Sequence, residues 1–339
     1  MNSNKIIRHK VVRHKRKIKT IGVLTSGGDA PGMNAAIRAV VRAGIYYGCR
    51  VIGIYKGYAG LLEGHFEEFN LSSVANIIQR GGTIIKSSRC PEFHKKSYRK
   101  QAHQNLVSHG IDALVAIGGD GTFRGAHLLW TETGFPVAGV PGTIDNDCWG
   151  TDITIGFDSA INTGLRAIDQ IRDTAGSHDR LFIVEVMGRN SGYIAMDVGI
   201  GGGADSIIIP EDPSSVKNIA AQIQRGVNRG KTSSIIVCAE GPVQGKSYAI
   251  ANELKKKYGY KARVCILGHT QRGGSPTARD RKVASIMGAM AVRELLGGYS
   301  DFMTGIDGLR PQLVSLIKAT EGKKTLHQDL ILLGKILAT

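Results

Sequence analysis

The chain has 339 residues, of which 42% are hydrophobic and 21% are charged. These proportions are ordinary for a globular protein, and the length leaves room for two domains. Its five cysteines have no C-x-x-C spacing, which argues against a disulfide framework and against a zinc site. No apolar run approaches the roughly 18 residues that a membrane-spanning helix needs, so the sequence predicts a cytoplasmic protein.

The net charge of +16 is unevenly distributed along the chain. Residues 5–19 carry eight lysines and arginines and no acidic residue. We predict that residues 1–18 form a disordered, solvated tail, with a nucleic-acid contact or a targeting segment as alternatives. The remaining positive charge is typical of a protein whose ligands are phosphates.

Beyond residue 18, short apolar runs alternate with segments of helical periodicity, and turn residues concentrate at 145–158. Continuous apolar strands separated by helices indicate parallel sheets covered on both faces. We therefore predict an α/β protein with two Rossmann-like three-layer domains and mostly parallel sheets. Strands are predicted at 19–24, 51–55, 113–117, 136–140, 181–186, 206–209, 235–238 and 264–267. Helices are predicted at 33–47, 98–108, 123–130, 159–171, 216–227 and 278–296.

Three polar motifs follow predicted strands, where ligands bind in such sheets. Residues 25–32 (TSGGDAPG) form either a phosphate-binding turn or a tight turn without a ligand. In residues 117–122 (IGGDGT), Asp120 suits a Mg²⁺ ion beside a triphosphate, with a helix-capping aspartate in a glycine turn as the alternative. In residues 141–147 (PGTIDND), Asp145 and Asp147 suit general-base work on a hydroxyl group, with an Asx-rich surface turn as the alternative.

Two further clusters combine arginine with glycine, which is the chemistry of phosphate recognition. Residues 187–189 (MGR) follow the strand predicted at 181–186. Residues 268–276 (GHTQRGGSP) follow the strand that ends near residue 267. Beside Arg272 in a glycine-rich loop, His269 is predicted to contact a ligand.

The segments TSGGDAPGMNAAIR, IGGDGT, PGTIDND, VEVMGR and LGHTQRGGSP occur in this order. In sequence and spacing they resemble bacterial ATP-dependent 6-phosphofructokinases, from about Lys19 to at least Leu296. The resemblance implies a glycolytic kinase that transfers the γ-phosphoryl group of ATP to the 1-hydroxyl of fructose 6-phosphate, with Mg²⁺. It also implies an ATP-binding domain at 19–157 plus about 276–322, a sugar-phosphate domain at 158–275, and a separate C-terminal segment at 323–339.

The resemblance assigns roles to individual residues. Asp145 is the implied base, with Asp147, Thr143 and Arg189 also implied in catalysis. The ATP site is implied to contain Gly28, Arg89, Cys90, Gly119, Asp120, Gly121 and Thr122, with Asp120 as the metal ligand. The sugar-phosphate site is implied to contain Thr143, Ile144, Asp145, Met187, Gly188, Arg189, Glu240, His269, Thr270, Gln271 and Arg272. A neighbouring subunit is implied to supply Arg180 and Arg263, so the protein is expected to be a homotetramer.

The family's allosteric pocket is matched less well. Arg38, Arg42, Arg172, Arg229 and Lys231 correspond to it. However, Leu71 stands where the family has arginine, Asp205 replaces a glutamate, and Thr232 and Ser233 replace basic residues. Regulation by a nucleoside diphosphate or phosphoenolpyruvate therefore stays open.

Two alternative functions remain. Diphosphate-dependent members of the family carry aspartate at the position of Gly121 and lysine at that of Gly142, so the two glycines favour ATP. A nucleic-acid-binding protein is favoured only by the basic residues, since aromatic residues for base stacking are few and no nucleic-acid motif is recognised.

Overall fold

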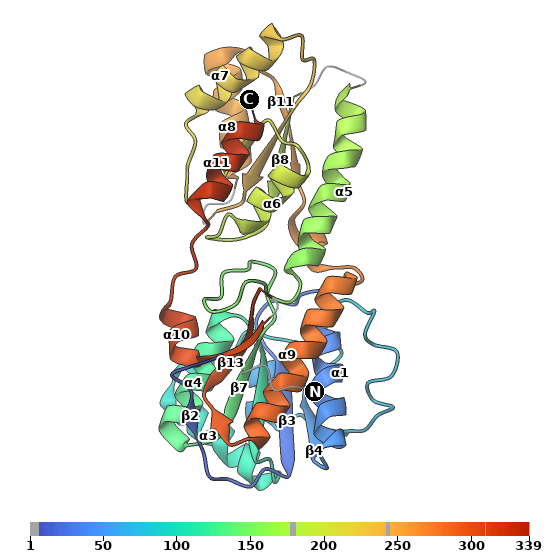
Figure 1. Ribbon diagram of the computed structural model, residues 1–339, viewed down its shortest axis with the longest axis vertical. Helices are drawn as coiled ribbons and strands as arrows, with labels where there is room; N and C mark the ends of the chain where they lie inside the picture. The colour runs from blue at the N-terminus through green and yellow to red at the C-terminus, as the bar shows by residue number, and fades with distance from the viewer. Residues whose placement is uncertain (1–6, 177–180, 242–244, 309, 339) are drawn as a thin grey trace. The chain divides into compact units, whose positions relative to one another are not determined.

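The computed structural model describes residues 7–176, 181–241, 245–308 and 310–338. These residues form two compact units (Figure 1). Unit 1 comprises the chain up to Thr143, Cys148–Gly156 and Gly273–Lys324, and unit 2 comprises the rest. Several of the crossings between the units lie within 143–157, the turn-rich stretch of the sequence.

Unit 1 contains an eight-stranded sheet in the order β1-β14-β13-β7-β6-β3-β4-β5. Only β13–β14 and β4–β5 are antiparallel among these pairs of described strands. The central strands are buried along their whole length, as their continuous apolar sequences predict. The strands are β1 (Ile7–His9), β3 (Thr20–Thr25), β4 (Arg50–Ile54), β5 (Phe66–Phe69), β6 (Ala113–Gly118), β7 (Val137–Pro141), β13 (Phe302–Asp307) and β14 (Arg310–Ser315).

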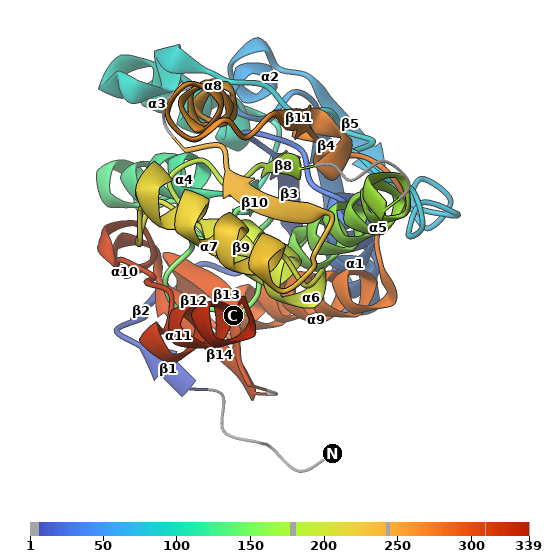
Figure 2. The same cartoon turned by 90° about the horizontal axis from the view of Figure 1, so that it is seen from above.

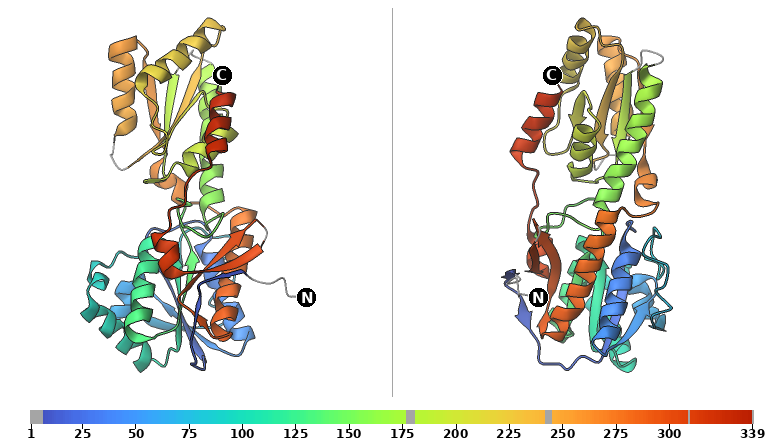
Figure 3. Two further views of the ribbon diagram at one scale, coloured as in Figure 1. Left: turned by 60° about the vertical axis from the view of Figure 1, so that its left-hand side comes forward. Right: turned by 45° about the vertical axis from the view of Figure 1, so that its right-hand side comes forward.

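Helices cover both faces of this sheet. On one face α1 and α9 lie side by side, as Figure 3 shows. On the other face α4 contacts β6 and β7 and packs against α3 and α10, around a core that includes Phe123, Leu106 and Leu114. The helices are α1 (Met33–Tyr46), α2 (Gly57–Glu63), α3 (Lys96–Ser108), α4 (Asp120–Thr133), α9 (Ala278–Leu296) and α10 (Leu316–Glu321), with a 3₁₀ turn η1 (Pro91–His94).

The beginning of the described chain is ordered, so the prediction of a disordered tail over 1–18 is wrong for 7–18. Strand β1 runs parallel to β14, with Ile7 opposite Gln312, and β2 (Val12–Arg13) pairs with β12 (Tyr299–Ser300). Arg8 donates a 2.9 Å hydrogen bond to Glu294, whose side chain is 6% exposed. Apolar β-branched residues lie between the cations, and they favour strands. Residues 1–6 lie outside the described part of the chain.

Unit 2 is built on a four-stranded, wholly parallel sheet in the order β11-β8-β10-β9. Helices α5 and α8 lie on opposite sides of the strands (Figure 2). The elements are β8 (Leu181–Val186), β9 (Ser206–Ile208), β10 (Ser234–Ala239), β11 (Ala262–Ile266), α5 (Phe157–Gly176), α6 (Tyr193–Gly201), α7 (Val216–Asn228), α8 (Lys246–Tyr258), η2 (Gly268–Arg272) and α11 (Gln328–Leu337). The predicted α/β class with two layered, mostly parallel domains is confirmed.

The C-terminal helix α11 belongs to unit 2, where the sequence predicted a separate segment at 323–339. It packs against α6 and β9, and Lys335 forms a 2.6 Å ion pair with Asp212. Only one face of this helix is buried, so the side chain of Ile331 is buried whereas that of Leu333 is exposed. Within the described residues, no helix is long and apolar enough to cross a membrane.

Candidate active site

The first glycine-rich turn of unit 1 connects β3 to α1. Gly27 and Gly32 have φ angles of 86° and 107°, which favour glycine. A Cβ atom on Gly32 would lie 2.7 Å from the side chain of Ile155. Ser87 donates a 3.0 Å hydrogen bond to the carbonyl of Gly27, while Gly28 is exposed at the tip of the turn. The turn is therefore fixed by its surroundings, with its backbone open to a ligand at Gly28.

The second turn, between β6 and α4, lies beside the first. Thr122 is 3% exposed and donates a 3.1 Å hydrogen bond to the carbonyl of Ser26. A Cβ atom on Gly118 would lie 2.4 Å from the same carbonyl, so glycine is required for this approach. By contrast, a Cβ atom on Gly121 would meet no atom within 4 Å. There is therefore open space beside Gly121 in the first turn of the 14-residue α4, and a helix N-terminus favours an anionic ligand.

Asp120, the predicted metal ligand, is the first residue of α4. Its side chain is 49% exposed and pairs with Arg124 at 3.1 Å. Arg124 also donates to the carbonyl of Thr320, so it is anchored at two points. Among the described residues, no cluster of three or more histidine, cysteine or acidic side chains could hold a metal. One half-exposed carboxylate is nevertheless the protein ligand that Mg²⁺ takes when phosphate oxygens and water complete its shell.

Arg89 and Cys90, also predicted for ATP, lie in unit 1 just before η1. Arg89 is exposed, and Ser87, two residues earlier, contacts the first glycine turn. Cys90 is half-buried, and burial raises the pKa of its thiol. The structure therefore brings the 87–90 segment to the turn that carries Gly28.

Asp145, the predicted base, lies in unit 2 and is only 4% exposed. Burial raises its pKa from the ordinary value to about 6, and the negative charge of Asp147 adds to the increase. The positive charges of Arg272 and Arg189 act in the opposite direction, while Glu240 raises the pKa further. A carboxyl group with this pKa is a base near neutral pH. The acidic and basic residues predicted from separate motifs therefore act on one carboxyl group.

The neighbours of Asp145 in sequence differ in exposure. Thr143, in unit 1, is 9% exposed, and its carbonyl accepts a 2.6 Å hydrogen bond from Thr154. Ile144 is fully buried, so a ligand would meet its main chain rather than its side chain. Asn146 adopts a φ of 52°, and Asp147 is exposed.

The loop after β8 carries Met187, Gly188 and Arg189. Gly188 has a φ of 139°, and a Cβ atom there would lie 2.5 Å from the carbonyl of Ser191. Arg189 has a φ of 52° although it is not glycine. Its N–H donates a 2.8 Å hydrogen bond to Oε1 of Glu240, which follows β10. The structure thus brings together Arg189 and Glu240, which the sequence predicted for the same ligand.

The 3₁₀ turn η2 contains the residues predicted to bind the sugar phosphate. His269 and Thr270 are exposed and Arg272 is half-buried, so these side chains are accessible to a ligand. Gln271 is different, because it is fully buried and its side chain bonds the main chain at Met187 and Ala160.

Of the two arginines predicted to complete the site of a neighbouring subunit, the structure describes Arg263 but not Arg180. Arg263 lies on β11, at the edge of the unit 2 sheet, and is exposed. Arg180 lies outside the described residues, so its prediction has no structural counterpart.

Two cations of the predicted allosteric pocket, Arg172 and Lys231, already have partners. Arg172 donates to the carbonyls of Gly202 and Gly203, at 3.0 Å in the second case. Lys231 pairs with Asp205. In unit 1, Leu71 is 47% exposed, Arg38 is half-buried and Arg42 is exposed.

Two supporting residues were not predicted from the sequence. Ser191 donates a 3.1 Å hydrogen bond to the carbonyl of Asp145. Asp280 is fully buried near the start of α9 and accepts a 2.9 Å hydrogen bond from the N–H of Gly156, the last residue of unit 1 before α5. The only signal for Asp280 is the capping sequence Thr277-x-x-Asp280, in which Thr277 accepts from the N–H of Asp280.

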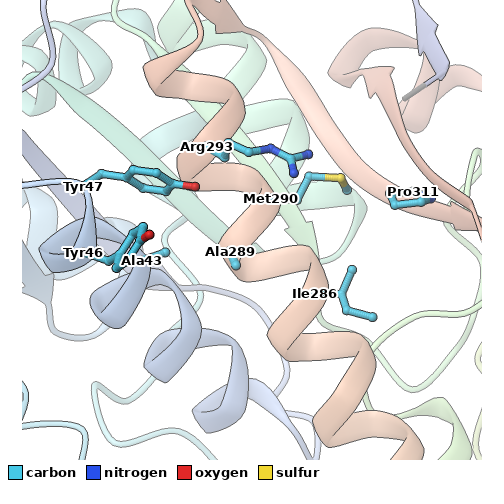
Figure 4. A pocket seen from close by; sticks show the side chains of 8 residues that line it. All are labelled: Ala43, Tyr46, Tyr47, Ile286, Ala289, Met290, Arg293 and Pro311. Carbon is cyan, nitrogen blue, oxygen red and sulfur yellow. The ribbon is translucent and has the colours of Figure 1, made fainter. Parts of the chain in front are cut away.

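A cavity of 390 Å³ between α1 and α9 in unit 1 contains none of the predicted site residues (Figure 4). Figure 4 shows Tyr46, the last residue of α1, and Tyr47, which follows it, together with Met290 and Arg293 from α9. Its lining is mainly apolar and offers little chemistry for a phosphate ligand.

Comparisons with known proteins bear on the whole chain. The family profile described as "Phosphofructokinase" matches residues 20–295. The chain is 53% identical over 321 residues to an ATP-dependent 6-phosphofructokinase of Thermus thermophilus, covering 95% of this chain and 100% of the relative. A protein of the same name from Bacillus mycoides is 50% identical with the same coverage.

Solved structures give the same result. The chain is similar to phosphofructokinase from Saccharomyces cerevisiae, with a TM-score of 0.85 and 36% identity. That match covers 94% of this chain and 48% of the yeast chain, so this chain spans about half the yeast chain's length. A pyrophosphate-dependent phosphofructokinase from Marinobacter aquaeolei has a TM-score of 0.81 at 23% identity. The match covers 95% of this chain and 92% of the Marinobacter chain, and it shows a shared fold alone. The chain belongs to the phosphofructokinase family.

Proposed function

We propose that this protein is an ATP-dependent 6-phosphofructokinase, which transfers the γ-phosphoryl group of ATP to the 1-hydroxyl of fructose 6-phosphate. The observation that carries the proposal is the environment of Asp145 in unit 2. A buried carboxyl group with a pKa of about 6 feels the positive charges of Arg272 and Arg189, which are side chains of the kind that a phosphorylated substrate requires. The near full-length relatives that bear this name support the choice of donor and acceptor.

We assign the donor to unit 1. The adjoining turns at Gly28 and Gly119–Thr122, with the N-terminus of α4, offer backbone N–H groups to the phosphates of ATP. Arg89 would lie beside the transferred group and neutralise its charge. Asp120 would hold Mg²⁺, which when bound neutralises phosphate charge and orients the nucleotide.

We assign the acceptor to unit 2. His269 and Arg272 on η2 would bind the 6-phosphate, while Arg189, Glu240 and the backbone at Met187 would hold the sugar. Binding the distant phosphate uses remote contacts to orient the reacting hydroxyl group.

In the reaction, Asp145 accepts the proton of the 1-hydroxyl as its oxygen attacks the γ-phosphorus. The bond from that phosphorus to the bridging oxygen breaks, and ADP leaves with the electron pair. Little other covalent chemistry is asked of the protein, so positioning and charge neutralisation dominate catalysis. The raised pKa of Asp145 makes it a stronger base than an exposed aspartate while keeping it ionised above about pH 6.

We further propose a homotetramer in which Arg180 and Arg263 of one subunit complete the sugar-phosphate site of the next. Arg263 supports this by its exposed position on the edge strand β11. We also propose a cytoplasmic location, since Cys49, Cys90, Cys238 and Cys265 are thiols and not disulfides, as is usual in a reducing compartment.

The function is tested by identifying the product. The purified protein is incubated with ATP, Mg²⁺ and fructose 6-phosphate, and phosphorus NMR follows the new phosphate ester. We expect fructose 1,6-bisphosphate and ADP in equal amounts. ATP hydrolysis without a new sugar ester would contradict the proposal.

The shared site is tested with mixed oligomers of Arg263→Ala and Asp145→Asn chains. Each homo-oligomer should be nearly inactive at low fructose 6-phosphate concentration. Hybrids whose composition is established by native mass spectrometry should regain activity, because some sites receive two intact contributions. Hybrids without any recovery would contradict the sharing.

A further inference from the structure

Gln271 occupies an unusual place in a turn that otherwise faces a ligand. His269 and Thr270 are exposed and Arg272 is half-buried, whereas Gln271 is fully buried. The alternation means that the side chain of Gln271 points into the protein while its neighbours point outward. The buried side chain of Gln271 is therefore not accessible for a direct contact with the sugar phosphate.

Both ends of the Gln271 amide are used by the main chain of unit 2. Its Oε1 accepts a 2.8 Å hydrogen bond from the N–H of Met187, and its Nε2 donates a 3.2 Å hydrogen bond to the carbonyl of Ala160. An N–H can only donate and a carbonyl can only accept, so the two partners fix the orientation of the amide. Gln271 thereby links η2 to the loop after β8 and to the first turn of α5.

The loop that begins at Met187 needs such support. Gly188 and Arg189 both have positive φ, and for arginine this conformation is strained. Within the described residues, three side chains from outside the loop bond its main chain: Gln271 at Met187, Glu240 at Arg189 and Glu211 at Gly192. Strained backbone at a site persists only where its surroundings hold it in place.

We propose that Gln271 is a positioning residue, which locks the turn bearing His269 and Arg272 to the loop bearing Arg189 without contacting the substrate. This inference rests on the proposed function, because it assumes that both segments bind fructose 6-phosphate. The two arginines must keep a fixed separation to act on one substrate molecule. The Gln271 bond to Met187 ties the turn to the loop, and its bond to Ala160 anchors the same turn to α5.

The groups around Asp145 provide an independent readout. Arg272 and Arg189 lower the pKa of Asp145, whereas Asp147 and Glu240 raise it. Arg272 neighbours Gln271 in the turn, and Arg189 lies in the loop that Gln271 holds. If the lock is lost and either arginine moves away, the pKa of Asp145 rises. The acidic limb of the activity profile then moves to higher pH.

The test uses Gln271→Met, which removes both hydrogen bonds, and Gln271→Glu, which keeps the acceptor but turns the donor into a second acceptor facing Ala160. Gln224→Glu is the matched control. Gln224 also accepts one hydrogen bond, from Tyr260, and donates one, to Asn228, but it lies on the exposed surface of α7. Steady-state kinetics are measured for both substrates from about pH 5 to 9, a range that brackets neutral titrations.

We expect the KM for fructose 6-phosphate to rise about tenfold for Gln271→Glu, as for one lost hydrogen bond, and further for Gln271→Met, which loses two. The KM for ATP should stay within about twofold, and the acidic limb of kcat/KM should move up by about half a pH unit. The control should match the wild type. If Gln271 touched the phosphate, Gln271→Glu would be far worse than Gln271→Met and the limb would not move, which would overturn the proposal.

A purely structural role would also overturn it, and would be seen as lower thermal stability with both KM values unchanged or both raised. If one variant does not fold, the other still gives the comparison with Gln224→Glu. The wild type is measured first with ATP and fructose 6-phosphate. Absence of that activity would count against the proposed function itself, whereas a wild-type rate with unaltered Gln271 variants counts against this inference alone.

Discussion

The hydroxyl group of Ser191 donates a 3.1 Å hydrogen bond to the main-chain carbonyl of Asp145. Ser191 lies just before α6, and its bond holds the main chain of Asp145, the proposed base. The bond does not involve the Asp145 carboxyl group. Replacing Asp145 by asparagine should therefore remove the base while leaving the backbone anchor in place.

We predict that Asp145→Asn lowers kcat by roughly 10² to 10⁴, the contribution of a placed general base. The affinity for ATP should be nearly unchanged, because the proposed nucleotide residues lie in unit 1. Steady-state kinetics and ATP titration calorimetry measure the two quantities. Asp169→Asn, on the exposed surface of α5, is the control and should retain wild-type kcat. An Asp145→Asn protein that keeps more than about a third of wild-type kcat would rule out this base.

The pH profile provides a second prediction. Asp145 must be ionised to accept a proton, so activity should fall as the pH drops through its pKa of about 6. Asp147 raises that pKa by its negative charge, so Asp147→Asn should lower it and move the acidic limb of kcat/KM to lower pH. The phosphate of the substrate titrates identically with both proteins, so the difference between the two profiles reports the enzyme. A limb that stays in place or moves to higher pH would contradict the assigned environment.

The choice of donor depends on two glycines in unit 1. A Cβ atom at Gly121 would meet open space, which we assign to the α-phosphate of ATP, whereas one at Gly142 would lie 3.0 Å from Ile117 and 3.1 Å from Met33. We predict that Gly121→Asp sharply reduces turnover with ATP, because the new carboxylate would crowd and repel that phosphate. The KM for fructose 6-phosphate should stay near the wild-type value. Unchanged ATP kinetics in this variant would show that the space at Gly121 has another use.

Allosteric activation by ADP should be weak or absent. Leu71, Thr232 and Ser233 lack the cations of the family pocket, and Lys231 is already paired with Asp205. Each missing charge-assisted hydrogen bond is worth roughly 1.5 to 3 kcal/mol, so several together would reduce affinity by orders of magnitude. Saturation curves for fructose 6-phosphate with and without millimolar ADP test this. Sigmoidal curves made hyperbolic by ADP would contradict the prediction.

The first ordered strand should contribute to stability rather than to catalysis. Arg8 pairs with the nearly buried Glu294, and the guanidinium groups of Arg8 and Arg13 lie 4.6 and 4.7 Å from the ring centre of Tyr299. We predict that Arg8→Ala lowers the free energy of unfolding by about 1 to 2 kcal/mol. Kinetic constants at 25 °C should be unaffected. Lys15→Ala, at an exposed position of the same segment, is the control for denaturant titrations. Equal stability of the two variants would indicate that the ion pair is not stabilising.

The elements that the sequence predicted well carry unambiguous local signals. Strand β8 occupies the predicted 181–186, because LFIVEV is a short, nearly continuous apolar run without helical periodicity. Helix α9 occupies the predicted 278–296, between the capping residue Thr277 and Gly297. The α6 helix was missed because it is apolar on nearly all sides, so its sequence shows no amphipathic pattern. Strand β1 was missed because its charges conceal a pairing with β14, some 300 residues away in the sequence.

Candidate site residues could be predicted where a sequence motif contains them. The direction in which a side chain points could not be predicted, because the packing of the folded chain decides it. The carboxylate of Asp145 and the cations of Arg189 and Arg272 were identified from their motifs. Gln271 belongs to the same motif as Arg272, yet only the packing of η2 reveals that its amide faces inward. Ser191 and Asp280 bond backbone groups far from them in sequence, so no local pattern could indicate these bonds, although the capping sequence at Thr277 marks Asp280.

The central claim is tested most directly by one coupled assay of fructose 1,6-bisphosphate formation. The wild-type protein is given saturating fructose 6-phosphate and Mg²⁺, first with ATP and then with inorganic diphosphate at the same concentration. We predict rapid product formation with ATP and negligible formation with diphosphate. A faster rate with diphosphate would contradict the assigned donor, and no product with either donor would contradict the assigned activity.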